Sequence, residues 1–287
     1  MIRAAGGLLA VFGLLLSAQD FTEIKFDHLA RGLGFTEGPA WSREGYLIFS
    51  DTPADRLMKW TPGSPIEVFR PASGPSGNAF DSEGRLLTCE TRARRVVRLD
   101  KKGALEVLAE RWEGKRLNAP NDIVVSKSGH IYFTDPAFGE QAEHRELDFY
   151  GVYHIAPKAP MKLVAKPAGR PNGVALSPNG RILYVVNSDE RNLRAYDLDK
   201  SGEPSNERVL IAKIPGVPGG VRTDEKGNLY IAGKGLFIYG PDGKPLHTLE
   251  LRTPASNCGF GEVDGRTLFF TAGSEIHRAR LDVKGAY

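Results

Sequence analysis

The stretch SKSGHIYFTD at residues 126–135 combines a polar turn, a glycine and an apolar strand, and this pattern recurs along the chain. The other five copies are SREGYLIFSD (42–51), DSEGRLLTCE (81–90), SPNGRILYVVN (177–187), DEKGNLYIAG (224–233) and EVDGRTLFFTA (262–272). The repeated glycines, which are separated by 39, 45, 51, 47 and 38 residues, are Gly45, Gly84, Gly129, Gly180, Gly227 and Gly265. A glycine at the same place in each copy predicts a hairpin turn with positive φ. This period is typical of the four-stranded blades of a β-propeller.

Two more apolar strands follow most of these hairpins. They read RLMKW and IEVFR, RVVRL and ALEVLA, GVYHI and MKLVA, LRAYDL and RVLIAK, and LFIYG and LHTLEL. The sixth hairpin is followed only by EIHRARL, and EIKFDHL at residues 23–29 can supply the missing strand. Closing the ring in this way removes an open sheet edge that would invite aggregation. We therefore predict an all-β fold, a six-bladed β-propeller closed by an N-terminal strand.

The N-terminus has the features of a secretory signal peptide. Residues 1–19, MIRAAGGLLAVFGLLLSAQ, contain a positive charge at Arg3, an apolar run from Leu8 to Leu16, and the small residues Ser17 and Ala18. The alternative is a short membrane anchor, but the run is shorter than the ~20 residues that a spanning helix needs. We expect cleavage near Ala18 to Asp20, export to the periplasm or the medium, and no membrane association afterwards. Residues 20–287 are then expected to form a single propeller domain.

The composition fits an ordinary globular protein and argues against several partners. Of the 287 residues, 41% are hydrophobic and 25% are charged, which is enough apolar content for a substantial core. The net charge of +3 is small and the charges are interleaved, so we expect no nucleic-acid partner. The two cysteines, Cys89 and Cys258, could form a disulfide after export, but two buried thiols are the favoured interpretation.

Polar residues recur at the start of the predicted innermost strands, which line the central channel of a propeller. Eight residues before the six turn glycines lie Glu37, Ser76, Asn121, Asn172, Gly219 and Asn257. Asparagine before glycine or aspartate is also common in turns. However, recurrence at one offset would gather these side-chain oxygens on the axis, and a carboxylate with several amide oxygens suits a hard divalent cation. The pattern predicts an axial metal site, with calcium as the default ion.

The second strand of each hairpin should end on the same face of the ring. The polar residues at these ends are Asp51, Glu90, Asp135 and Asn187. The third repeat has its extra length in residues 138–151, FGEQAEHRELDFYG, which could form a lid over the pocket. His144 in this loop is either a solvated residue or a catalytic one. We expect the other histidines to lie on outer strands or on the opposite face, away from the site.

Several stretches resemble the family of gluconolactonases, regucalcin (senescence marker protein) and luciferin-regenerating enzyme, which also includes relatives that hydrolyse organophosphates. The resemblance covers nearly the whole mature chain and is carried by FTEGPAW (35–41), GKRLNAPNDIVV (114–125), YFTDPAFG (132–139), RPNGVALSPNG (170–180) and SNCGFG (256–261). It implies a six-bladed propeller with one central divalent metal, whose ligands match Glu37, Asn121 and Asn172 here. Bacterial members with the KRLN-x-PND stretch resemble lactonases that act on sugar acids.

The chain departs from the family pattern at the start of the fifth repeat. Family members usually read Pro-Asp-Gly there, and the aspartate is both a metal ligand and the favoured general base. This sequence has Pro218-Gly219-Gly220, and Ser76 stands where relatives often have asparagine. Losing one of two carboxylates halves the charge opposite the ion, so weaker metal binding is expected.

The resemblance implies an exported hydrolase of sugar-acid lactones that uses a metal-activated water. With Gly219 unable to act as a base, the candidates for accepting the proton of the water are Glu37 itself, Asp135 and Glu90. The candidates for binding the substrate are Asn118, Asn121 and Arg116, with Lys115 beside them; ordinary solvated loop residues are the alternative. A rival hypothesis is a metal-binding propeller that binds a sugar or other small ligand and has lost turnover, which Gly219 would support.

Overall fold

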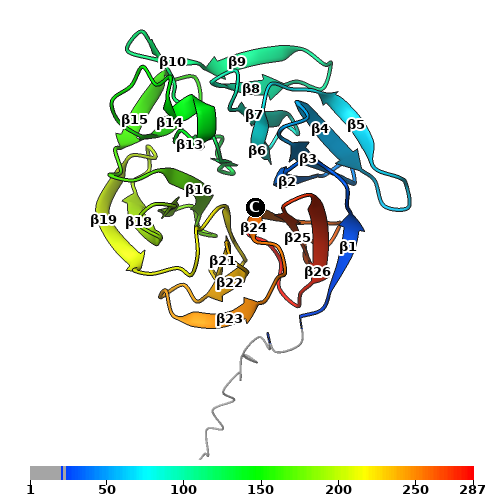
Figure 1. Cartoon of the computed structure of the whole chain (residues 1–287). Coiled ribbons are helices and arrows are strands. Elements are labelled where there is room, and N and C mark those ends of the chain that lie inside the picture. Colours follow the sequence, from blue (N-terminus) through cyan, green and yellow to red (C-terminus); the bar gives the residue numbers. More distant parts are fainter. Residues whose placement is uncertain (1–20, 22–23) are drawn as a thin grey trace, which may run out of the picture.

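The computed structural model describes residue 21 and residues 24–287, so the predicted signal peptide lies outside the described part of the chain. In that part, six four-stranded antiparallel sheets are arranged as blades around a central axis (Figure 1). This confirms the predicted six-bladed β-propeller. Among the described residues, no helix has the length and apolar character needed to cross a membrane.

The first three blades follow the repeats along the chain, and the strands of each blade run in sequence order from the axis outward. Blade 1 contains β2 (Thr36–Ser42), β3 (Tyr46–Asp51), β4 (Arg56–Trp60) and β5 (Glu67–Pro71). Blade 2 contains β6 (Pro75–Phe80), β7 (Leu86–Glu90), β8 (Arg95–Leu99) and β9 (Leu105–Ala109). Blade 3 contains β12 (Ile123–Val125), β13 (Ile131–Asp135), β14 (Gly151–Ile155) and β15 (Met161–Ala165).

The other three blades complete the ring. Blade 4 contains β16 (Pro171–Leu176), β17 (Ile182–Asn187), β18 (Asn192–Leu198) and β19 (Pro204–Ile211). Blade 5 contains β20 (Val221–Thr223), β21 (Leu229–Ala232), β22 (Leu236–Tyr239) and β23 (Pro245–Leu249). Blade 6 contains β24 (Ala255–Gly261), β25 (Thr267–Ala272), β26 (Glu275–Arg280) and β1 (Phe26–Ala30). A small hairpin of β10 (Arg111–Trp112) and β11 (Lys115–Arg116), and the 3-10 helix η1 (Gly139–Ala142), lie outside the blades.

The repeated glycines form the turns that the sequence predicts. All six have positive φ, between 68° and 90°, a region that residues with a β-carbon rarely adopt. In each turn the glycine N–H donates to the carbonyl of the residue three positions earlier, as in the bond from Gly129 to Ser126 at 2.9 Å. The glycines therefore fix where each innermost hairpin reverses.

The N-terminal strand closes the ring as the sequence predicts. Strand β1 pairs antiparallel with β26, with His28 opposite His277. The strand spans residues 26–30, and a bulge between His28 and Ala30 carries the pairing one residue beyond the predicted end at Leu29. Phe21 precedes the strand and packs edge-on against Tyr230 of blade 5.

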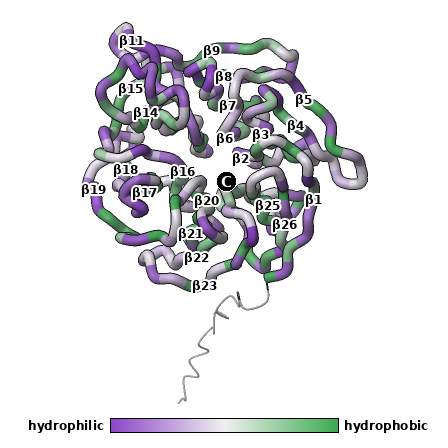
Figure 2. The backbone as a smooth tube through the Cα atoms, in the orientation of Figure 1, coloured by the Kyte–Doolittle hydropathy of each residue, from purple (hydrophilic) through white to green (hydrophobic). Residues whose placement is uncertain are grey.

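The apolar core is divided among the interfaces between blades. In the described part of the chain it forms six clusters, one between each pair of adjacent blades. Accordingly, apolar and polar stretches are interspersed around the whole ring (Figure 2). Cys89 and Cys258 are buried in two of these clusters as free thiols, which confirms the favoured interpretation of the two cysteines. Burial of one apolar face per blade against the next is what holds the innermost strands around a common axis.

Candidate functional site

The residues eight positions before the first five turn glycines occupy equivalent places around the axis. Neighbouring blades are joined at this level by hydrogen bonds to the carbonyl groups of these residues. The Gly77 N–H donates to the Asn121 carbonyl at 2.7 Å, and the Gly173 N–H donates to the Gly219 carbonyl at 3.1 Å. These bonds keep the starts of adjacent innermost strands in register.

Blade 6 departs from the equal offset that the other blades follow. In blades 1 and 6 the pairs Thr36–Asp51 and Ala255–Ala272 begin the innermost hairpin, so Ser256, one residue after Ala255, is the counterpart of Glu37. The hairpin of blade 6 contains one more residue in each strand, and this moves Asn257 one place along. The prediction that Asn257 occupies the place equivalent to Glu37 was therefore wrong, although the side chain of Asn257 reaches the axis.

A network of three side chains, from Asp122, Arg222 and Asn257, lies at the axis next to this ring of residues. The Arg222 guanidinium forms a bidentate ion pair with the buried carboxylate of Asp122, at 2.9 and 3.1 Å. The Asn257 amide lies 3.4 Å from Asp122 and donates to Glu37 Oε2 at 3.0 Å. Sequence reasoning missed Asp122 and Arg222, because they are 100 positions apart and neither belongs to the repeated offset.

Glycines make room for this network. Gly38, Gly77, Gly173 and Gly220 occupy the places in blades 1, 2, 4 and 5 that Asp122 occupies in blade 3. A Cβ at Gly77 would lie 2.7 Å from Asp122 Oδ1, and one at Gly220 would lie 2.0 Å from Asn257 Oδ1. Real Cβ atoms do not approach other atoms this closely, so the glycines are required for Asp122 and Asn257 to lie across the channel.

Glu37 is the carboxylate nearest this network. Its side chain is buried, and Oε2 accepts hydrogen bonds from Gly38 N–H and Asn257 Nδ2, both at 3.0 Å. No described residue donates a hydrogen bond to Oε1. Burial raises the pKa of Glu37 to about 7, and the nearby Asp122 carboxylate adds to this rise. An ionised Glu37 would therefore be stabilised by a cation at the axis.

The asparagines of blades 3 and 4 occupy the places in the ring that Glu37 occupies in blade 1. Asn121 Oδ1 is buried and has no hydrogen-bond partner among the described residues. The Asn172 amide nitrogen donates to Ser188 Oγ at 3.1 Å, which leaves its oxygen as the free end of the amide. A carboxylate with amide oxygens is the donor set of a hard divalent cation, so these three residues fit the predicted metal.

The other predicted catalytic carboxylates, Asp135 and Glu90, are already engaged by groups of the protein. Asp135 accepts the backbone N–H groups of Asn118 and Ala119, each at 2.8 Å, and burial raises its pKa to about 7. Glu90 is buried between Arg70 and Arg95, at 3.3 and 2.7 Å. Both groups are thus bound through the chain's own donors, whereas Glu37 keeps an oxygen to which no described residue donates.

The predicted substrate contacts in the loop before β12 are also partly engaged. The Asn118 amide nitrogen donates to the carbonyls of Asp135 and Phe149, whereas its buried Oδ1 has no partner in the described residues. The half-buried Arg116 lies in β11 and donates from Nη2 to the Ala93 carbonyl at 2.7 Å. The free atoms of these side chains are therefore the Asn118 oxygen and the remaining guanidinium nitrogens of Arg116.

The loop predicted as a lid is bound to blade 2 and to the small hairpin of β10 and β11. Arg94 donates to the His144 carbonyl at 3.2 Å, and the Arg116 N–H donates to Glu146 at 2.8 Å. Leu147 is buried, and the His144 side chain is exposed. The position of His144 is that of a solvated loop residue, which was one of the two alternatives.

A cavity of about 340 Å³ lies between the innermost strands, towards the ends at which they turn. Its lining includes Arg222, Lys127 and the C-terminal Tyr287, but not Glu37, Asn121 or Asn172. The cavity is therefore distinct from the predicted metal site.

The backbone of blade 6 leaves no room for a side chain at Gly219. A Cβ at Gly219 would lie 2.2 Å from the Ser256 carbonyl oxygen. We expect Gly219→Ala to lower the free energy of unfolding by about 2 kcal/mol, measured by urea denaturation. Gly219→Asp carries the same Cβ and should create no activity that the native chain lacks.

The matched control is Gly233→Ala in the same blade, where the nearest atom to a Cβ is a ring carbon of Phe237 at 3.2 Å. We expect a clearly smaller loss of stability there. Equal stability of Gly219→Ala and the native protein would show that the strand shifts freely, contrary to this prediction.

Comparison with known proteins agrees with the fold. Residues 35–274 match the SMP-30/Gluconolactonase/LRE-like region. A gluconolactonase of Zymomonas mobilis is 33% identical over 90% of this chain and 81% of its own length. A 6-deoxy-6-sulfogluconolactonase of Pseudomonas putida is 26% identical over 85% of this chain and 84% of its own length. A solved gluconolactonase structure from Xanthomonas campestris has a TM-score of 0.84 at 30% identity, covering 91% of this chain and 90% of the other. The chain therefore belongs to the SMP-30/gluconolactonase/LRE-like family.

Proposed function

We propose that the protein is an exported, metal-dependent lactone hydrolase that opens a sugar-acid lactone. The observation that carries this proposal is the buried Glu37 carboxylate at the axis, with Oε1 free of hydrogen bonds to described residues, in a chain related to gluconolactonases. The proposed export rests on the sequence of residues 1–19. Mass spectrometry of the exported protein would test whether cleavage occurs near Ala18 to Asp20, just before Phe21.

The residues that would hold the cation are Glu37, Asn121 and Asn172, and their oxygens favour calcium. A divalent cation bound there supplies Lewis acidity for the ester carbonyl and lowers the pKa of a water ligand. The chain's own part is to present one carboxylate and two amide oxygens in a ring that the blade interfaces keep rigid. The buried Asn121 oxygen, which has no partner among the described residues, is the structural feature that supports this assignment.

Glu37 is the proposed general base among the three carboxylates. Opening a lactone breaks the ring ester bond, adds water to the acyl carbon, and returns a proton to the departing alkoxide oxygen. In its ionised form, the Glu37 carboxylate would accept the proton of the water and then donate it to the leaving oxygen. Asp135 and Glu90 are less suited, because backbone N–H groups and arginines already occupy their oxygens.

The proposed substrate contacts come from the loop before β12 and from blade 3. The Asn118 oxygen would accept a hydrogen bond from a sugar hydroxyl, and Arg116 would bind a hydroxyl or carboxylate oxygen. Asn121 follows these two residues in the sequence and lies in the ring at the axis. Its side chain would therefore contact the lactone ring as well as bind the cation. A polyhydroxylated lactone supplies the donors and acceptors that these groups need.

A binding module that lacks turnover is the second candidate. Gly219 favours it, because no carboxylate from blade 5 joins Glu37 at the axis. In that case the same residues would bind a cation and a sugar ligand without an efficient base.

The two candidates are separated by assaying the purified protein against glucono- and galactono-lactones. After chelation, adding back Ca²⁺ should restore acid release, followed in a pH-stat, well above the spontaneous rate. A rate equal to the spontaneous one at every Ca²⁺ concentration, with ligand binding retained in calorimetry, would favour the binding module.

A further inference from the structure

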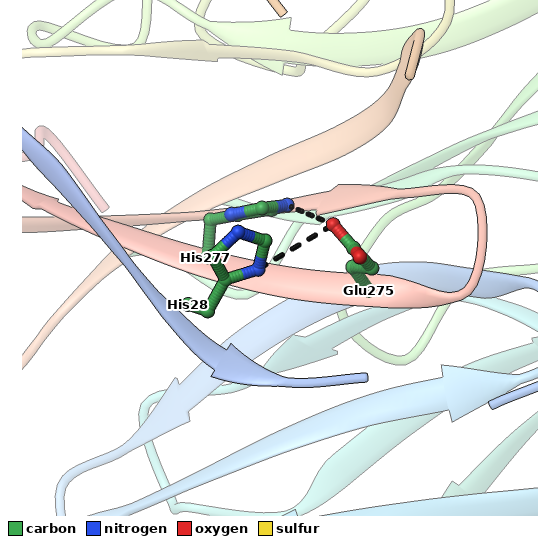
Figure 3. A group of neighbouring side chains, drawn as sticks. All are labelled: His28, Glu275 and His277. Carbon is green, nitrogen blue, oxygen red and sulfur yellow. Dashed lines mark ion pairs between the residues drawn. The ribbon is translucent and has the colours of Figure 1, made fainter. Parts of the chain in front are cut away.

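We propose that His28, Glu275 and His277 form a second metal site, for a transition-metal ion such as Zn²⁺, that ties the N-terminal strand to blade 6. The three side chains converge at the β1–β26 pair (Figure 3). The site lies on the outer strands of the blade and shares no residue with the axial site.

Strand pairing explains why the three side chains meet. His28 and His277 lie directly opposite each other on antiparallel strands, and Glu275 precedes His277 by two residues on the same strand. Side chains two residues apart on a strand point to the same face, and directly opposed pairs are neighbours on that face. Three potential ligands are therefore presented on one side of the sheet edge.

The distances are close to those of a metal site. Glu275 Oε2 lies 3.4 Å from His28 Nδ1 and 3.2 Å from His277 Nε2, and the three ligand atoms all lie within 4.8 Å of one another. A tetrahedral ion with bonds of about 2.1 Å has ligand atoms about 3.4 Å apart. Both nitrogen–oxygen distances already fit, and the half-exposed His28 ring can rotate to close the remaining distance.

Packing holds His277 in position while His28 stays accessible. The His277 ring stacks on Phe270 with centroids 5.0 Å apart and meets the edge of Phe26 at 5.5 Å. The His277 side chain is only 5% exposed, whereas that of His28 is 45% exposed. One ligand is thus fixed, and solvent and ions reach the site from the side of His28.

The donor set selects the class of ion. Two imidazoles with one carboxylate suit Zn²⁺ and similar first-row ions, whereas calcium prefers oxygen ligands. A metal binds the neutral form of the imidazole, so the affinity of the site for the ion should fall at acidic pH. Water would complete the coordination on the exposed side.

The site would stabilise the closure of the propeller. His28 belongs to the strand that completes blade 6, and the other two ligands belong to its partner strand. An ion that binds the paired strands but not the separated ones shifts the equilibrium towards the closed ring. The expected partner is therefore a structural ion, and the lactonase activity should not depend on it.

The test measures thermal unfolding of tag-free full-length protein after chelation, with Zn²⁺ or Ca²⁺ added back. At about 100-fold excess over the dissociation constant, Zn²⁺ should raise Tm by about 5 °C. His28→Gln and Glu275→Gln should abolish this rise, and Co²⁺ should show visible bands of a tetrahedral site only in proteins that keep all three ligands. Any rise in Tm that Ca²⁺ produces should be the same in native protein and in the His28→Gln and Glu275→Gln variants.

Two controls distinguish this site from others. His130→Gln removes a histidine that contacts another histidine, His154, in blade 3 at 2.8 Å, and it should leave the Zn²⁺ response unchanged. Glu37→Gln disables the axial site and should also leave that response unchanged. The proposal is overturned if native protein shows no Zn²⁺-dependent rise, or if His28→Gln retains it in full. Neither result bears on the proposed lactonase, because His28→Gln should keep native kcat/KM.

Discussion

Glu37→Gln is expected to lower metal-dependent lactonase kcat/KM by about 10³-fold, the range typical for loss of a general base. The substitution keeps the size of the side chain but removes the charge opposite the cation and the group that accepts the proton. Of the three candidate carboxylates, only Glu37 has an oxygen to which no described residue donates, so we do not expect Asp135 or Glu90 to replace it. Initial rates at saturating Ca²⁺, compared with native protein, measure the effect.

The same substitution should stabilise the metal-free protein at high pH. Burial raises the pKa of Glu37 from 4.5 to about 7, so its contribution to stability is present below pH 4.5 and is lost as the pH rises through about 7. The loss amounts to on the order of 3 kcal/mol when complete. The glutamine side chain does not ionise, so the chelated variant should be more stable than chelated native protein at pH 8 and nearly equal to it at pH 4.

Urea denaturation at both pH values measures this difference. Asp135 has a similarly raised pKa, but it is present in both proteins and cancels in the comparison. Added Ca²⁺ should stabilise native protein at pH 8 and have much less effect on the variant. A variant with native activity would show that Glu37 is not the base, and a chelated variant that is less stable than chelated native protein at pH 8 would show that the pKa of Glu37 is not raised by folding.

The fold could be predicted because each repeat contains the sequence signal of its own turn. A glycine such as Gly129 fixes the hairpin, and the apolar residues after it indicate a buried strand. Local patterns therefore specified most of the strands, including the closing strand apart from its bounds. The small hairpin of β10 and β11 was missed, because two-residue strands carry no periodic signal.

Site positions could be predicted only where the eight-residue offset from the turn glycine gives equivalent places in the blades. Glu37, Asn121 and Asn172 follow from that rule, but Asn257 does not, because the hairpin of blade 6 is longer. The partners of Asp135 and Glu90 depend on how distant loops and strands pack, which spacing along the chain does not specify. The Asp122–Arg222 pair likewise joins blades 3 and 5, so no local pattern could reveal it.

Arg222→Met is expected to lower the free energy of unfolding by about 4 kcal/mol, as is typical when one partner of a buried ion pair is removed. The Asp122 side chain is fully buried, and both of its oxygens accept hydrogen bonds from Arg222. Val174 N–H at 3.1 Å and the Asn257 amide would remain as its only donors among the described residues. They carry no positive charge, so the carboxylate would be left without a counter-charge.

The double variant Asp122→Asn with Arg222→Met separates the ion pair from its surroundings. Removing both charges should cost less than the sum of the two single losses, because no charge is left unpaired in the double variant. Arg280→Met is the control, since it breaks an exposed pair with Asp264 and should change stability by less than about 1 kcal/mol. Strict additivity at positions 122 and 222 would contradict the coupling that the structure indicates.

The pair should also tune Glu37, and here the two single variants act in opposite directions. The Asp122 charge raises the pKa of Glu37, whereas the Arg222 charge lowers it. In metal-free protein, Asp122→Asn should therefore move the titration of Glu37 to lower pH, and Arg222→Met should move it to higher pH. Comparing the pH dependence of stability of each variant with and without Glu37→Gln isolates that titration. Shifts in the same direction would mean that altered packing, and not charge, connects the ion pair to the carboxylate at the axis.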